Sequence, residues 1–224
     1  MNYFAHGRRF LDKPYFLAGT AVPDWLNVVN RRARARARRA RPLLMDADPH
    51  IAAVAGGVIQ HHFDDHWFHQ TPAFASLQLK FTVAIRDQLP PDNGFRTSFL
   101  GHIMVELLLD AVLIQEDVKQ LDYYYAAIRS LDAQIVTRAV NRMTTQPADG
   151  LAPLLPRFSD ERFLYDYLED GKLLWRLNQV MHRLKLPPLP ESLTAWFPDA
   201  RDEVRQHATE LLSQPPSSQS KAPL

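Results

Sequence analysis

The chain has 224 residues, of which 46% are hydrophobic and 23% charged, and its formal net charge is +1. This is the length and composition of a globular protein with a core of its own. The sequence holds no cysteine, which excludes disulfides, thiolate zinc sites, iron–sulfur clusters and cysteine nucleophiles, so any metal must be bound by His, Asp, Glu and water. No apolar run reaches the roughly 18–20 residues that a membrane span needs, and the first residues lack the pattern of a signal peptide. We therefore expect a cytoplasmic protein with no membrane partner.

Helical patterns follow one another along the chain, with boundaries uncertain by about 2–4 residues. The clearest begins at Asp48, an N-cap followed by proline at the first helical position, and it ends before Thr71, where the next helix starts in the same manner. We expect a loop over 147–156 and a disordered tail over 214–224. No alternating strand pattern is present, so we predict an all-α fold in which residues 1–213 form a single domain. The predicted helices cover residues 14–30, 48–70, 73–89, 95–116, 118–144, 158–185 and 199–213.

The predicted helix over 48–70 carries the most notable pattern, because four of the nine histidines lie between His61 and His69. At 3.6 residues per turn, His61, Asp65 and His69 follow at i, i+4 and i+8 and lie along one face. Imidazole nitrogens and carboxylate oxygens aligned in this way are suited to hold a divalent metal ion. We interpret the other polar residues of this stretch as solvated surface; they are His62, Asp64 and His66.

The predicted helix over 95–116 repeats this spacing with His102, Glu106 and Asp110, among residues that are mostly apolar. Three polar side chains in line on such a helix are costly to bury without partners. A metal ion or the histidines of the first helix would supply these partners if the two helices pack side by side, as in the metal sites of helix bundles. The alternative for both helices is a polar network without metal, in which His–Asp hydrogen bonds tie the helices together.

Three short motifs, MNYFAH, AGTAVPDW and GVIQHHFDDHWFHQTP, resemble in order and spacing those of the acyl carrier protein phosphodiesterase family. The resemblance covers about residues 1–115. His69 stands where the family has a second Asp, and Gly101 stands where the family has Asp before a histidine. The residues that match are His6, Gly19, Asp24, Gly57, His61, Asp65, Pro72 and His102.

The family is similar in fold to the HD-type metal-dependent phosphohydrolases, so the resemblance implies an HD-like helical bundle. Its members use a divalent metal to remove the phosphopantetheine arm from acyl carrier protein, which implies metal-assisted phosphodiester hydrolysis. The metal would polarise a phosphoryl oxygen and lower the pKa of a bound water. The extra imidazole of His69 shifts the donor set toward nitrogen and favours Zn, Fe, Mn or Ni over magnesium. The implied metal ligands are His61, Asp65 and His102, with Glu106 and Asp110 in place of the lost carboxylate, and the implied catalytic or orienting residues are Asp24, His6 and His69.

Two other functions stay open at this point. The helix around His102 also resembles, more weakly, the metal-binding helices of zinc-dependent phospholipase C and related nucleases, in which an acid follows a histidine by one turn. A helical binding protein without catalysis, held together by a structural polar network, is the non-enzymatic alternative.

A run of seven arginines and four alanines occupies the stretch from Arg31 to Arg41. This positive charge would attract a phosphoester substrate or an acidic partner such as acyl carrier protein. No aromatic residue is interleaved with the arginines, which argues against single-stranded nucleic acid as the partner without excluding it. A solvated, highly charged helix or loop is the alternative.

Overall fold

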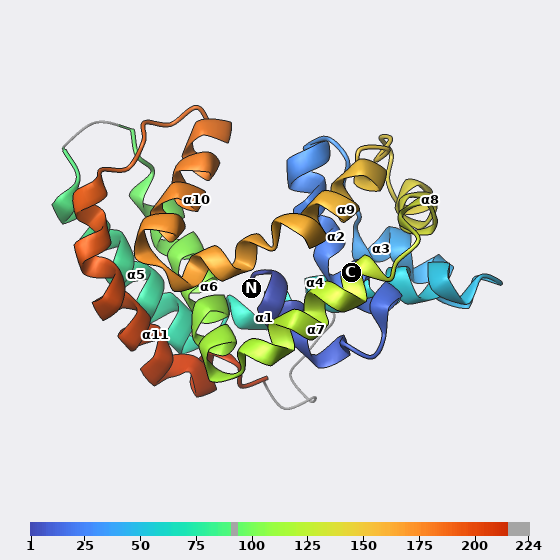
Figure 1. Ribbon diagram of the computed structural model, residues 1–224, viewed down its shortest axis with the longest axis horizontal. Helices are drawn as coiled ribbons and strands as arrows, with labels where there is room; N and C mark the ends of the chain where they lie inside the picture. Colours follow the sequence, from blue (N-terminus) through green and yellow to red (C-terminus); the bar gives the residue numbers. More distant parts are fainter. Residues whose placement is uncertain (91–93, 215–224) are drawn as a thin grey trace.

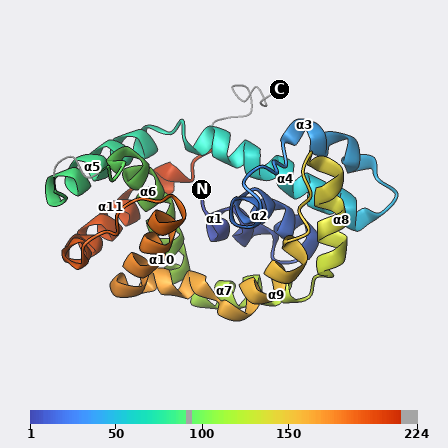
Figure 2. The ribbon, with the colours of Figure 1, turned by 90° about the horizontal axis from the view of Figure 1, so that it is seen from above.

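The segment α1 (Tyr3–Gly7) lies near the middle of the molecule, among longer helices (Figures 1 and 2). In this computed structural model, which describes residues 1–90 and 94–214, every residue of α1 is buried. It packs against three later helices, α2 (Pro14–Val29), α6 (Thr97–Glu116) and α7 (Val118–Arg129). A helix of this length has no stability of its own in water, so tertiary packing holds α1 in place.

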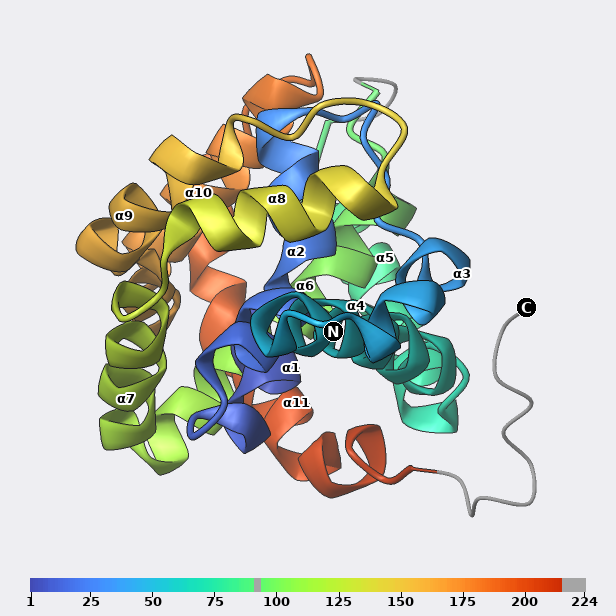
Figure 3. The ribbon, with the colours of Figure 1, turned by 90° about the vertical axis from the view of Figure 1, so that its right-hand side faces the viewer.

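All regular structure in the described residues is helical, which confirms the prediction of an all-α fold. Buried hydrophobic side chains form one continuous cluster, as expected for a single domain. The other α-helices are α3 (Ala37–Ala40), α4 (Pro49–Phe68), α5 (Pro72–Gln88), α8 (Ala133–Met143), α9 (Leu151–Glu161), α10 (Asp170–Arg183) and α11 (Phe197–Leu211), and the 3-10 helices are η1 (Arg8–Phe10), η2 (Arg41–Met45), η3 (Phe163–Leu168) and η4 (Glu191–Trp196). Figure 2 shows α5, α6, α10 and α11 on one side of the N-terminus and α2, α3 and α8 on the other. The end formed by α3 and α8 faces the viewer in Figure 3.

Helices α2 and α4 touch backbone to backbone where Gly19 meets Gly57. A Cβ added to Gly57 would lie 2.0 Å from the carbonyl oxygen of Phe16 and 2.7 Å from the Cα of Gly19. A Cβ added to Gly19 would lie 2.2 Å from the carbonyl oxygen of Val54. Only glycine permits so close an approach of two backbones, so this contact fixes how α4 is placed on α2.

Five of the predicted helices are confirmed with ends within about 2 residues, the uncertainty expected for such predictions. Two of these helices, α4 and α5, begin with the side-chain caps that their sequences predict. The carboxylate of Asp48 accepts a hydrogen bond of 2.9 Å from the backbone N–H of His50, and the hydroxyl of Thr71 accepts one of 3.1 Å from that of Phe74. The confirmed helices are α2, α4, α5, α6 and α11.

The prediction of one helix over 118–144 is wrong, because the chain breaks between α7 and α8. The carboxylate of Asp132 accepts hydrogen bonds from the backbone N–H groups of Gln134 and Ile135, and these bonds start α8 as a new helix. An Asp followed by a helical pattern is the sequence signal for this break.

The prediction of one helix over 158–185 is also wrong, because α9, η3 and α10 share this region. Arg162 adopts a left-handed conformation with φ 46°, which ends α9. The loop expected over 147–156 is shorter than predicted, since α9 begins at Leu151. Pro153 fits its first turn, where backbone N–H groups have no helical acceptor. The disordered tail predicted for 214–224 lies outside the described residues, apart from Gln214.

Helix α6 is long and apolar enough, by length and composition, to cross a membrane, although no uninterrupted apolar run was found in the sequence. In the structure 67% of this stretch is buried inside the protein. Most of this apolar stretch thus packs inside the protein, and it carries the polar residues His102, Glu106 and Asp110.

Replacing Gly57 by Ala is expected to lower the free energy of unfolding by about 3 kcal/mol, because the new methyl group must push α2 and α4 apart. Urea unfolding followed by circular dichroism measures the change. Gly171→Ala in α10 is the matched control, since a Cβ there meets no atom within 4 Å. The control is expected to be neutral or stabilising by up to about 1 kcal/mol. Equal effects of the two substitutions would contradict the backbone contact.

Candidate metal centre

Two groups of three ligand-type side chains lie where α1, α4 and α6 meet. The inner group is His6, His61 and Asp65, and the outer group is His69, His102 and Glu106. Within each group, one candidate ligand atom per residue lies within 4.8 Å of the others. The structure therefore brings together residues from three separate helices that the sequence singled out.

In the inner group two imidazoles face one carboxylate. The Nε2 atom of His6 lies 3.2 Å from Oδ1 of Asp65, and Nε2 of His61 lies 3.3 Å from Oδ2 of the same residue. The two rings stack with centroids 4.2 Å apart. Both histidines are buried, whereas the carboxylate of Asp65 is 31% exposed. The inner group thus has two buried nitrogen donors and one oxygen donor that solvent can reach.

The hydrogen bonds behind the imidazoles fix which nitrogen faces the group. The Nδ1 atom of His61 lies 2.8 Å from the carbonyl oxygen of Thr20 in α2. A carbonyl oxygen only accepts, so this Nδ1 carries the proton and, in the neutral ring, Nε2 keeps its lone pair. Nδ1 of His6 in turn points to the carboxylate of Asp64 at 3.5 Å. Histidines that bind metals are held by just such contacts on their other nitrogen.

Asp64 is wholly buried, so its interpretation as solvated surface is wrong. Besides His6, its carboxylate accepts hydrogen bonds from Gln60 Nε2 at 2.9 Å, from Trp67 Nε1 at 3.3 Å and from the Arg9 guanidinium at 3.3 Å. Burial raises the pKa of Asp64, but the donated hydrogen bonds and the charge of Arg9 lower it by more, so its pKa lies below the ordinary value. A carboxylate with so many donors is held rigidly, and it orients His6.

The remaining polar residues of α4 differ in their surroundings. Nε2 of His62 lies 2.7 Å from the carbonyl oxygen of Ala35, so His62 is partly buried beside the arginine run. His66 is exposed, as the sequence predicts, and contacts Gln70.

The outer group is built around Glu106. Its Oε1 atom lies 2.9 Å from Nε2 of His69 and 3.2 Å from Nε2 of His102. Burial raises the pKa of Glu106, but the α-ammonium of Met1 and the two imidazoles lower it well below its usual range. The imidazoles of His69 and His102 are 31% and 35% exposed. They are the two site histidines that solvent reaches most readily.

The α-ammonium group of Met1 joins the two groups. Its nitrogen lies 2.7 Å from Oδ1 of Asp65 and 3.1 Å from Oε1 of Glu106. Burial opposes this charge, but the two carboxylates raise the pKa of the ammonium to about 10. The same contacts help to hold the pKa of Asp65 well below its ordinary value although the residue is largely buried. The carboxylates of Asp65 in α4 and Glu106 in α6 therefore both contact the ammonium group of Met1.

Two of the predicted site residues, Asp110 and Asp24, lie outside both groups. The carboxylate of Asp110 accepts hydrogen bonds from the backbone N–H groups of Phe4 and Ala5, at 3.0 and 2.8 Å, and so anchors α1 on α6. Asp24 has a buried Oδ2 atom for which residues 1–90 and 94–214 supply no hydrogen-bond partner. Burial raises the pKa of each of these carboxyl groups to about 7.

Gly101, which replaces an Asp of the resembled family, faces α5 rather than the centre. A Cβ at this position would lie 2.4 Å from Oγ1 of Thr82 and 2.7 Å from the carbonyl oxygen of Gln78. No carboxylate fits there unless α5 moves away from α6. The departure from the family motif thus has a packing reason in this fold.

The inner group fits a divalent metal by its donors and by its unsatisfied atoms. Nε2 of His6 is buried and has no hydrogen-bond partner in the described part of the chain, although Asp65 lies near it. Two imidazole nitrogens and a carboxylate oxygen form the donor set that zinc and related metals prefer, with further positions left for other ligands. Oδ2 of Asp24 is an additional buried oxygen in the same part of the core.

The arginine run lies on the surface beside α4. All seven of its arginines are exposed, whereas Ala33, Ala35 and Ala40 are buried. This alternation attaches the stretch to the core through alanine and leaves the arginines on the surface. None of the seven belongs to the inner or the outer group.

Replacing Asp64 by Ala is expected to lower the free energy of unfolding by about 3 kcal/mol, because buried donors on His6, Gln60 and Trp67 lose their common acceptor. Urea unfolding measures the loss. Asp160→Ala removes an exposed carboxylate that pairs with Arg129 at 2.9 Å, and it should cost no more than about 0.5 kcal/mol. A loss for Asp64→Ala as small as that of the control would rule out its orienting role.

Comparisons with known proteins add no family to this geometry. The chain matches no family model, and no curated protein and no solved structure matches it. The assignment of function therefore rests on the side chains that meet at α1, α4 and α6.

Proposed function

We propose that the protein is a metal-dependent phosphodiester hydrolase whose inner group binds the metal. The observation that carries this proposal is the fixed orientation of two buried imidazoles, each with Nδ1 directed to an acceptor and Nε2 directed to Asp65. Imidazoles that bind metals are oriented in this way, with Nδ1 on an acceptor and Nε2 turned toward the ligand group.

The ligands in this proposal are His6, His61 and Asp65. A divalent metal bound there would polarise a phosphoryl oxygen and neutralise charge in the transition state. Asp64 and the carbonyl of Thr20 hold the two imidazoles in position. His6 is thereby assigned as a ligand rather than as a catalytic base.

The outer group supplies proton transfer in this proposal. The imidazoles of His69 and His102 are partly exposed to solvent, as is the carboxylate of Asp65, and Glu106 holds both imidazoles through Nε2. Imidazoles are suited to donate a proton to the leaving oxygen of a phosphodiester and to accept one from water near neutral pH. Asp24 offers an acceptor from the buried side.

The resemblance to acyl carrier protein phosphodiesterases supports the same reaction and an HD-like fold. His6, His61 and Asp65, three residues of the resembled motifs, are the three that form the inner group. The natural substrate in this proposal is a phosphodiester carried by an acidic partner, acyl carrier protein being the example that the resemblance implies, with the exposed arginines of the run as its docking surface. A cytoplasmic location follows from such a substrate.

A structural polar network is the second candidate, and the contacts of Met1 favour it. Its ammonium group already bonds to the carboxylates of Asp65 and Glu106 and offsets part of their charge without a metal. In that case the two groups would serve to hold α1 between α4 and α6. Metal content distinguishes the two functions.

Protein purified without an affinity tag and without added metal is expected to retain a transition metal, measured by elemental analysis. His61→Ala should lower metal affinity more than about tenfold, because it removes a ligand whose geometry is fixed by α2. His66→Ala is the matched control on the same helix, with an exposed ring outside both groups. If His61→Ala holds metal as the parent does, the ligand assignment is wrong. If the parent holds none and shows no metal-dependent thermal shift, the structural network is the function.

Hydrolysis of bis(4-nitrophenyl) phosphate and of phosphopantetheine-loaded acyl carrier protein should be measured side by side. His102→Ala is expected to lower kcat on both substrates by about 10²–10⁴ while the metal content stays that of the parent, because proton transfer is lost and the inner group is intact. Arg34→Ala should leave hydrolysis of the small substrate unchanged. Full activity of His102→Ala would remove the outer group from the reaction.

A further inference from the structure

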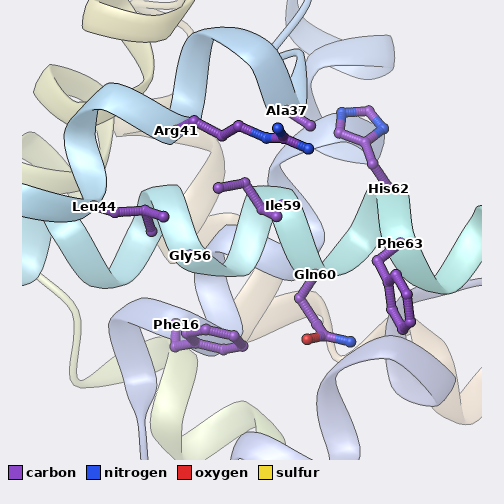
Figure 4. Close-up of a pocket in the computed structure, with 9 residues that line it drawn as sticks. All are labelled: Phe16, Ala37, Arg41, Leu44, Gly56, Ile59, Gln60, His62 and Phe63. Carbon is purple, nitrogen blue, oxygen red and sulfur yellow. The ribbon is translucent and has the colours of Figure 1, made fainter. Parts of the chain in front are cut away.

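A pocket of about 250 Å³ lies on the outer side of α4, between this helix, α2 and the segment that contains α3 and η2 (Figure 4). Figure 4 shows α4 crossing the pocket, with Phe16 and Phe63 on one side of it and Leu44, Ile59 and Arg41 on the other. The remaining lining residues are Ala37, Gly56, Gln60 and His62.

The pocket is separate from the candidate metal centre because the two use opposite faces of α4. Gly56, Ile59 and Phe63 line the pocket, whereas His61 and Asp65 belong to the inner group. At about 100° per residue, the mean directions of these two sets differ by roughly half a turn. A ligand in the pocket would therefore not contact the metal ligands.

The pocket exists because residue 56 is glycine. A Cβ at this position would lie 3.0 Å from Cε2 of Phe16 and 3.8 Å from Cδ2 of Leu44. Any larger side chain would point between these two residues and fill the space. Residue 56 thus controls the volume of the pocket at the place where Phe16 of α2 packs over α4.

The residues that line the pocket favour a ligand that has an apolar body and a negative charge. Four of the lining side chains are large and apolar, and two of these, Phe16 and Phe63, are aromatic. Arg41 is the charged side chain among the described lining residues, and none of them is acidic. The amide of Gln60 donates to Asp64, and Nε2 of His62 lies 2.7 Å from the carbonyl oxygen of Ala35.

We propose that this pocket binds a small soluble organic anion, an aromatic or short aliphatic body that carries a sulfonate, carboxylate or phosphate. The apolar body would contact Phe16, Ile59 and Phe63, and the anion would face the guanidinium of Arg41. The volume lies just below the roughly 300–1,000 Å³ of pockets for drug-sized ligands, so the ligand is smaller than these. The exposed arginines next to Arg41 raise the local concentration of anions.

Isothermal titration calorimetry with naphthalene-2-sulfonate tests the proposal, using the full chain in excess EDTA so that the metal centre plays no part. Neutral 2-naphthalenemethanol and cationic 2-naphthylmethylammonium are the comparison ligands. The parent is expected to bind the sulfonate more tightly than the alcohol and the alcohol more tightly than the ammonium. Gly56→Leu should abolish binding of all three, because its side chain occupies the pocket.

Arg41→Gln is expected to weaken binding of the sulfonate by about fivefold and to leave the alcohol unchanged, since it removes one charge at the rim. Arg32→Gln, an exposed arginine of the same run that does not line the pocket, is the matched control and should bind as the parent does. Circular dichroism establishes that each variant is folded, and Arg41→Gln decides the matter if Gly56→Leu does not fold.

Three outcomes would overturn the proposal: no binding by the parent, parental binding by a folded Gly56→Leu variant, or equal loss for Arg41→Gln and Arg32→Gln. None of them bears on the proposed hydrolase, whose failure would be seen in metal content alone.

Discussion

The contact between Gly19 and Gly57 is the constraint on which both the candidate metal centre and the pocket beside Phe16 depend. Because the backbones of α2 and α4 touch there, Thr20, one residue beyond Gly19, comes within 2.8 Å of His61, one turn beyond Gly57. That hydrogen bond selects the tautomer of His61. On the outer side the same crossing sets Phe16 against Gly56 and leaves the pocket.

Burial raises the pKa of all four interior carboxyl groups, but neighbouring charges and hydrogen bonds outweigh it at only two of them. Asp65 and Glu106 share a cation and several imidazoles, so each stays ionised although it is largely withdrawn from water. At Asp24 and Asp110 burial outweighs the charge of the same ammonium group and raises the pKa of each carboxyl group to about 7. Environments that separate the pKa values of neighbouring carboxyl groups are typical of sites that move protons. The four carboxyl groups thus differ in how fully other charges and hydrogen bonds offset the effect of burial.

The sequence predicts α4 and α6, two of the three helices that carry the site, and the pairs one turn apart on each, whereas α1 is not among the predicted helices. His61 with Asp65 and His102 with Glu106 come together as the spacing of four indicates. Residues eight apart do not stay aligned, because two turns of an α-helix use 7.2 residues and the face drifts by about 80°. His69 accordingly turns away from His61 toward α6.

Contacts between distant segments could not be predicted from this spacing. Arg9 and His6 contact Asp64 on that flank of α4. No local sequence pattern predicts these contacts between distant segments. The same drift carries Asp110 away from His102 to the backbone of α1. The left-handed residue Arg162 likewise has no local signal, because its conformation is stabilised by hydrogen bonds to Asp122 and Tyr165.

The anchoring of α1 by Asp110 has a consequence for the order of folding. The two hydrogen bonds join residues 105 and 106 positions apart in the chain. Helix α1 therefore cannot reach its native place until α6 has been synthesised and packed. Loop closure over such a distance carries an entropic cost that local helices do not bear. The polar centre is accordingly assembled late, after the helices that surround it have already formed.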